Sequence, residues 1–148
     1  MNKESVHTKI KEEIDFRVKK IQTALNQQKE SLKTASESTA GDKHNTARAM
    51  MHIEEEKLEK QLAQLITLKK LIAKVHPSKK STSITLGSLV ETNKGWLYIA
   101  VPIGKISIHG IDIMGVSLAS PIGQALKEKN KFDAVSFNGQ NWEIINIL

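Results

Sequence analysis

The sequence predicts an α+β protein, with a long antiparallel coiled-coil hairpin of two helices followed by a small domain built on an antiparallel sheet and one short helix. The first half is rich in Lys, Glu, Gln, Leu and Ile, and its apolar residues recur at alternating intervals of three and four. The second half changes to β-branched residues separated by turns that contain Asn and Gly. Five of the six aromatic residues follow residue 95, so a conventional core is expected there. We therefore expect a hairpin over residues 1–76 and a compact domain over 77–148.

The first helix is predicted by a regular apolar seam in which only Gln28 is polar. Val6 and Ile10 precede this seam at a step of four, which predicts a local slip of the helix pairing. Three heptads of helix are therefore expected, with the seam formed by Ile14, Val18, Ile21, Leu25, Gln28, Leu32 and Ala35.

The second helix is predicted by the return of the same alternation, and Pro77 is expected to end it because proline cannot continue a helix. A short connection makes the two helices antiparallel neighbours. A turn centred near residue 41 then brings Gln28 close to Glu54, and each arm is roughly 45–50 Å long. The second seam consists of Ala47, Met51, Glu54, Leu58, Gln61, Leu65, Leu68, Ile72 and Val75.

The C-terminal part alternates in the manner of strands. Strand-like segments are expected in SITLGSLVE, WLYIAV, KISI, IDIMGVSLA, DAVSF and WEIINIL, with turns at NKG, HG and NGQN. Ser120 before Pro121 predicts the start of a helix, since serine caps a helix and proline is favoured at the first helical position. A helix of two to three turns is therefore expected in IGQALKEKNK.

Composition and charge exclude several classes of protein. The net charge of +6 is spread over both parts, with 15 basic against 11 acidic residues before residue 77 and 7 against 5 after it. Such mixing is typical of a solvated surface, whereas phosphate-binding surfaces cluster their positive charge. The chain has no cysteine, which excludes disulfides and cysteine-based zinc sites. No apolar run approaches membrane-spanning length, so we expect a cytoplasmic protein without a membrane partner.

No catalytic motif accounts for the polar residues. The five histidines lack metal-ligand spacing, and the glycines and serines match no nucleotide-binding loop or nucleophile motif. What remains is the segment SESTAGDKHN between the two helices, with Glu37 and Asp42 at the expected hairpin tip, about residues 36–46. Asp42 is interpreted either as the cap of the second helix or, with Glu37, as a carboxylate offered to a metal inside a partner.

One stretch resembles a known family. The segment SPIGQALKEKNKFDAVSFNGQNWEIINIL, with LGSLVE upstream, resembles the C-terminal domain of the Gre transcript-cleavage factors, in which an SP-I/L-G/A-x-A-L helix lies between strands and precedes a Gly-Asp turn. The hairpin is similar to the Gre coiled coil in order, length and tip placement. The resemblance implies an FKBP-like domain that docks at the rim of the secondary channel of bacterial RNA polymerase, while the coiled coil reaches the active centre. Tip acids there help to hold a second Mg²⁺, so that polymerase cuts the extruded 3′ end of backtracked RNA.

The resemblance also implies roles for residues at the tip. The family tip reads Asp-x-x-Glu at the start of the second helix, which places Asp42 and Asn45 at the two functional positions. Asp42 would ligate Mg²⁺ only within the polymerase complex, whereas Asn45 brings an amide oxygen without charge. Glu37 is the candidate substitute for the second acid. The factor would lend ligands to polymerase, without being an enzyme or holding a cofactor itself.

A second set of residues is implied in docking. Ser120, Pro121, Ile122 and Gly123 match the SP-containing segment and are the expected contacts with polymerase, although the same residues could simply start a helix and pack it on the sheet. A departure from the family lies close by. Phe132 precedes Asp133 where the family has Gly-Asp.

Three alternatives remain open. Asp42 alone would suit a secondary-channel binder that does not cleave but competes with cleavage factors or alters initiation and pausing. An FKBP-like domain could be a prolyl isomerase, although the aromatic residues are few. The seam could also pair between chains in an oligomerisation scaffold, whereas the hairpin interpretation predicts a monomer.

Overall fold

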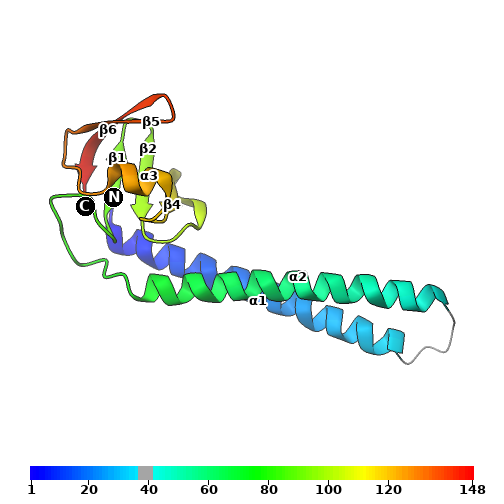
Figure 1. Cartoon of the computed structure of the whole chain (residues 1–148). Coiled ribbons are helices and arrows are strands. Elements are labelled where there is room, and N and C mark those ends of the chain that lie inside the picture. Colours follow the sequence, from blue (N-terminus) through cyan, green and yellow to red (C-terminus); the bar gives the residue numbers. More distant parts are fainter. Residues whose placement is uncertain (37–41) are drawn as a thin grey trace. The chain divides into compact units, whose positions relative to one another are not determined.

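The computed structural model describes the chain at residues 1–36 and 42–148, with side chains at 1–34 and 46–148. Helix α1 (Lys3–Ser36) and helix α2 (Asp42–Ala73) precede a sheet with one short helix, α3 (Pro121–Leu126), so the α+β class with a helical hairpin is confirmed (Figure 1). The chain forms two compact units. One contains Met1–Glu13 together with Leu68–Leu148, and the other contains Ile14–Thr67.

Within Ile14–Thr67, the predicted seam of α1 is the less exposed side of the helix. Leu25 and Leu32 are buried, at 6% and 8% exposure, and Val18, Ile21 and Gln28 are half-buried. Neighbouring residues outside the seam, such as Phe16 at 62%, remain exposed. The intervals of three and four therefore identified the side of α1 that is covered.

The seam of α2 departs from the prediction at one position. Glu54 is exposed, whereas the Glu55 side chain retains only 19% exposure and lies 3.8 Å from His52 Nδ1. The Gln28 amide donates a hydrogen bond to the Met51 carbonyl oxygen at 3.0 Å. The backbone of α2 therefore provides a partner for Gln28, and Glu54 lies outside the covered side of the helix.

The sheet has six strands in the order β3-β4-β2-β1-β6-β5. Neighbours run antiparallel except for β2 and β4, which are parallel, so the antiparallel expectation is corrected for that pair. Gly115 in β4 permits this arrangement, because a Cβ there would lie 2.9 Å from the Val101 carbonyl of the β2–β3 connection. The strands are β1 (Leu89–Thr92), β2 (Gly95–Ile99), β3 (Gly104–Ile108), β4 (Ile111–Val116), β5 (Ala134–Phe137) and β6 (Gln140–Ile147).

The turns predicted at HG and NGQN are present, the second as the two residues Asn138 and Gly139. His109-Gly110 joins β3 to β4 and Asn138-Gly139 joins β5 to β6, and all four residues have positive φ, as primed hairpin turns require. The strand expected over SITLGSLVE begins only at Leu89. Before it, Ser83 forms an isolated bridge with Asn130.

Both faces of the sheet are covered within the unit that contains it. Helix α3 covers one face, where Leu97 and Ile99 of β2 belong to the core. Tyr98 alternates to the opposite face and contacts His7 of α1, so the first turns of α1 cover that face. Val6 and Ile10 of α1 are fully buried there. The remaining core residues on the α3 side are Ile84, Val90, Leu126, Val135 and Ile144.

His7 and Tyr98 form a buried polar contact between α1 and the sheet. His7 Nδ1 lies 2.8 Å from the Tyr98 hydroxyl, and the rings meet edge to face at 88°. Burial lowers the pKa of His7 below its ordinary value of 6.5, and the nearby Lys11 ammonium lowers it further. Burial raises the pKa of Tyr98 to about 12. The pair is therefore held in its neutral form around neutral pH.

Replacing Tyr98 with Phe should lower the free energy of unfolding by about 1–3 kcal/mol, because it leaves a buried imidazole nitrogen without a partner. Urea denaturation measures the change. The double variant His7→Leu/Tyr98→Phe should recover part of this loss, since no polar atom is then left unsatisfied. Additive losses in the double variant would contradict a direct interaction.

Stability should also depend on pH through His7. The unfolded chain binds a proton at His7 near pH 6.5, whereas folded His7 resists protonation until the pH is lower. The free energy of unfolding should therefore fall as the pH drops through and below that value. Urea titrations between about pH 8 and pH 5 should show a shallower slope for His7→Gln than for the wild type. Equal slopes would show that His7 does not contribute.

Candidate functional site

The predicted docking segment forms the start of α3. Ser120 is the N-cap: its hydroxyl oxygen accepts from the Gly123 amide at 3.1 Å and donates to the Ser117 carbonyl at 2.6 Å. Pro121 follows at the first helical position, as expected. The helix is shorter than the two to three turns predicted, because it ends at Leu126 and Glu128 adopts a φ of 65°.

Three of the four predicted docking residues have structural roles that the sequence alone could not separate from docking. A Cβ on Gly123 would lie 2.7 Å from the Leu118 carbonyl oxygen and still closer to that of Ser117, so the backbone requires glycine. Ile122 is half-buried and packs against the core, and Ser120 caps the helix. Pro121, in contrast, is exposed. The segment therefore offers a partner chiefly Pro121 and the exposed edge of Ile122.

The tip residues are located only by the backbone. Helix α2 begins at Asp42, so Asp42 and Asn45 are three residues apart in its first turn. Their side chains, and Glu37 as a whole, lie outside the described residues. The predicted roles of these three residues therefore stay predictions.

The described residues contain neither a metal-binding cluster nor a membrane-spanning helix. No three His, Cys, Asp or Glu side chains among them gather in a way that could hold a metal ion. None of the described helices has the length and apolar character needed to cross a membrane.

One polar residue of the fold was missed at the level of sequence. The sequence indicated only that His7 lacks metal-ligand spacing, whereas in the structure it is buried at 7% exposure. Its position between Val6 and Ile10 was the available signal, because these residues share one side of a helix.

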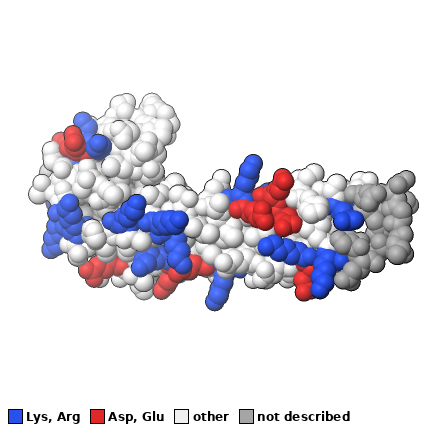
Figure 2. All heavy atoms as spheres, turned by 60° about the horizontal axis from the view of Figure 1, so that its bottom comes forward, with Lys and Arg blue, Asp and Glu red and all other residues white. Residues whose placement is uncertain are grey.

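Charged side chains of both signs occur on the face of the molecule shown in Figure 2. On the face shown in Figure 2, Lys and Arg side chains are interspersed with Asp and Glu. This distribution agrees with the mixed, solvated surface predicted from the sequence.

Comparisons with known proteins found little similarity in sequence. No protein-family model and no curated protein matches the chain. A solved structure described as "Structure of the transcription factor Gfh1" aligns with 93% of this chain and 92% of its own, with 17% identity and a TM-score of 0.37. The function is therefore argued below from the residues of this chain.

Replacing Gly123 with Ala should lower the free energy of unfolding by about 1–3 kcal/mol, because the new methyl group meets two backbone carbonyls that cannot move independently. This loss exceeds the gain of about 1 kcal/mol in helix propensity. The matched control Pro121→Ala, at an exposed position of the same helix, should change stability by less than about 0.5 kcal/mol. Denaturant unfolding of both variants is the measurement, and a stable Gly123→Ala protein would contradict the close packing.

Proposed function

We propose that this protein is a Gre-like transcription factor that docks on bacterial RNA polymerase and passes the tip of its helical hairpin into the secondary channel. One observation carries the proposal. The segment SPIGQAL, which resembles the Gre docking domain, lies in a capped helix packed on a sheet, and this domain follows a hairpin of long helices. Membership of the family rests on that resemblance.

The finer features of the fold belong to the same proposal. We take the hairpin as a coiled coil, because its covered residues follow intervals of three and four and Gln28 of α1 bonds to Met51 of α2. We take the C-terminal domain as FKBP-like by resemblance. Helix α1 has 34 residues, which correspond to about 51 Å of helix. Such a length suits a probe that works away from the surface on which its domain docks.

The chemistry of the tip follows from its donor atoms. Carboxylate and amide oxygens are suitable ligands for Mg²⁺, which prefers hard oxygen donors. Asp42 would supply one charged oxygen ligand within the polymerase complex, while Asn45 supplies a neutral one. Glu37 is the other carboxylate available in this part of the sequence. The metal belongs to the polymerase active centre, where it would promote hydrolysis of backtracked RNA.

The missing charge at Asn45 supports a second version of the proposal. A neutral amide attracts a divalent cation less strongly than a carboxylate does. The protein would then occupy the channel without cleaving RNA, and would act by competing with cleavage factors or by changing initiation and pausing. Transcription assays that score initiation, pausing and cleavage in parallel separate the two versions.

The two more remote functions fit the described residues less well. A prolyl isomerase needs aromatic side chains around an open pocket, but Tyr98 is fully buried against His7 and Trp142 packs against the core. An oligomerisation scaffold would pair the seam between chains. In this chain, Gln28 finds its partner at Met51 of the same molecule.

The Asn45→Glu variant tests the role of the tip. With backtracked polymerase complexes and Mg²⁺, Asn45→Glu should raise the rate of RNA cleavage by at least about tenfold, which corresponds to about 1.4 kcal/mol of barrier. Asn45→Gln, which keeps an amide, is the matched control and should leave the rate near that of the wild type. Asp42→Ala should abolish any cleavage by the wild type.

Binding to polymerase must be measured beside cleavage. If all variants bind equally and Asn45→Glu brings no cleavage, the tip does not deliver a metal ligand. If the wild-type protein does not bind polymerase, the proposed function as a whole is wrong.

A further inference from the structure

A tight turn before β5 carries an unusual residue. Asp133 donates its amide to the Asn130 carbonyl at 3.1 Å, which closes the turn, and its carboxylate accepts from the Asn130 amide at 2.7 Å. Phe132 is the third residue of this turn and has a φ of 75°. Glycine is strongly favoured in this conformation because any side chain there is strained.

The same residue also begins a β-bulge. The Phe132 amide donates to the Ile144 carbonyl at 2.7 Å, and the Ile144 amide donates to the Asp133 carbonyl at 2.9 Å. Phe132 and Asp133 together therefore oppose the single residue Ile144. In bulges of this kind the first residue, here Phe132, is characteristically glycine.

The Phe132 side chain buries little apolar surface and so contributes little to the stability of the fold. It is 81% exposed, which makes it the most exposed of the large apolar side chains described. The contact recorded for its ring is with the Lys131 ammonium, 5.1 Å from the ring centre. A residue that is both strained and exposed contributes less to stability than the glycine it replaces, which points to a role outside the folded monomer.

A second apolar residue is exposed at the same place. Strand β1 pairs Thr92 with Ile144 and Glu91 with Asn146, so Ile145 has no opposing residue in β1 and is 42% exposed. The peptide group between Ile144 and Ile145 is the one that accepts the Phe132 amide. The strand next to Phe132 thus carries a second exposed apolar residue, and we call Phe132 and Ile145 together the Phe132 corner.

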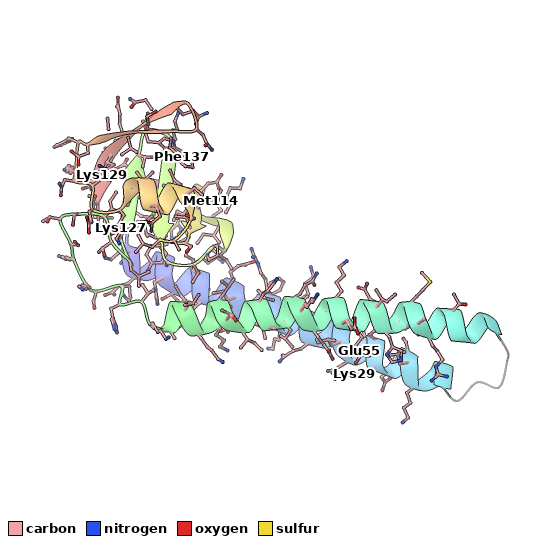
Figure 3. All side chains as sticks on the ribbon, in the orientation of Figure 1. Lys29, Glu55, Met114, Lys127, Lys129 and Phe137 are labelled. Atoms are coloured by element: carbon pink, nitrogen blue, oxygen red, sulfur yellow. The ribbon has the colours of Figure 1, made fainter. Side chains whose placement is uncertain are left out.

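The charges beside the Phe132 corner indicate the chemistry of its partner. Lys127, Lys129 and Lys131 are all exposed in the segment that joins α3 to β5, and Figure 3 shows Lys127 and Lys129 on this segment. A partner with carboxylates around an apolar pocket would complement this arrangement. We favour a protein over nucleic acid, because Ile145 offers no second aromatic face on which a base could stack.

We propose that Phe132 is a docking anchor that inserts into an apolar pocket edged by carboxylates on the surface of RNA polymerase, with the Lys131 ammonium next to its ring. This inference rests on the proposed function and adds to it a contact outside the Ser120–Gly123 segment. An exposed aromatic residue surrounded by polar contacts is the usual form of an interface hot spot.

The Phe132→Gly variant tests the anchor, because docking and stability should change in opposite directions. The variant should be at least as resistant to urea as the wild type, since glycine relieves the strained backbone. Its affinity for purified bacterial RNA polymerase core enzyme should fall by about 10- to 30-fold. Ile111→Ala, at a 43% exposed apolar residue of β4, is the matched control and should bind as the wild type does.

The outcomes separate this inference from the proposed function. If the wild type binds polymerase and Phe132→Gly binds equally well, the anchor is wrong while the proposed function stands. If Phe132→Gly loses stability, the ring has a structural role and the anchor is overturned. If Phe132→Gly weakens binding to a single-stranded RNA probe but not to polymerase, the corner binds nucleic acid instead. If the wild type fails to bind polymerase, the proposed function and the anchor both fail.

Discussion

The buried contact between His7 and Tyr98 ties the first turns of α1 to the middle of the sheet, at 2.8 Å between imidazole and hydroxyl. The sheet needs this cover because both of its faces are apolar. Helix α3 protects one face, and Val6, His7 and Ile10 protect the other. A polar pair in such a place stabilises only while both partners remain together, since either one alone would leave an unsatisfied buried group. The N-terminal residues therefore belong to the same compact unit as the sheet, although some eighty residues of sequence separate them.

The start of α3 and the turn at Phe132 show how structure helps to interpret a resemblance between sequences. Ser120 and Gly123 match the family segment, yet the fold itself explains both residues. Ser120 caps the helix, and Gly123 leaves room for two backbone carbonyls that a side chain would contact too closely. Phe132 departs from the family pattern and has no such reason. It keeps the positive φ that glycine would adopt freely and exposes its ring. Residues that the fold requires carry little information about partners, whereas a residue retained against the preference of the backbone carries more.

The proposed function divides the work between two parts of the chain. In that proposal the sheet domain would supply the contacts that hold polymerase, and the residues around the start of α2 would supply the oxygen ligands. The absence of a charge at Asn45 separates the two versions of the activity. A second carboxylate would strengthen the attraction for a divalent cation, whereas an amide does not. Docking and chemistry are therefore separable, and each can fail without the other.

Features that depend on neighbouring residues could be predicted from the sequence. The seam of α1, the His109-Gly110 and Asn138-Gly139 turns and the Ser120-Pro121 helix start are all encoded within a few positions, and each is present in the structure. Other features could be seen only in three dimensions: Glu55 rather than Glu54 lies at the seam, and β2 and β4 are parallel. His7 is buried, whereas Phe132 and Ile145 are exposed. These features depend on which segments meet across long stretches of chain. Packing and hydrogen bonds between distant residues, rather than local propensity, determine which segments come into contact.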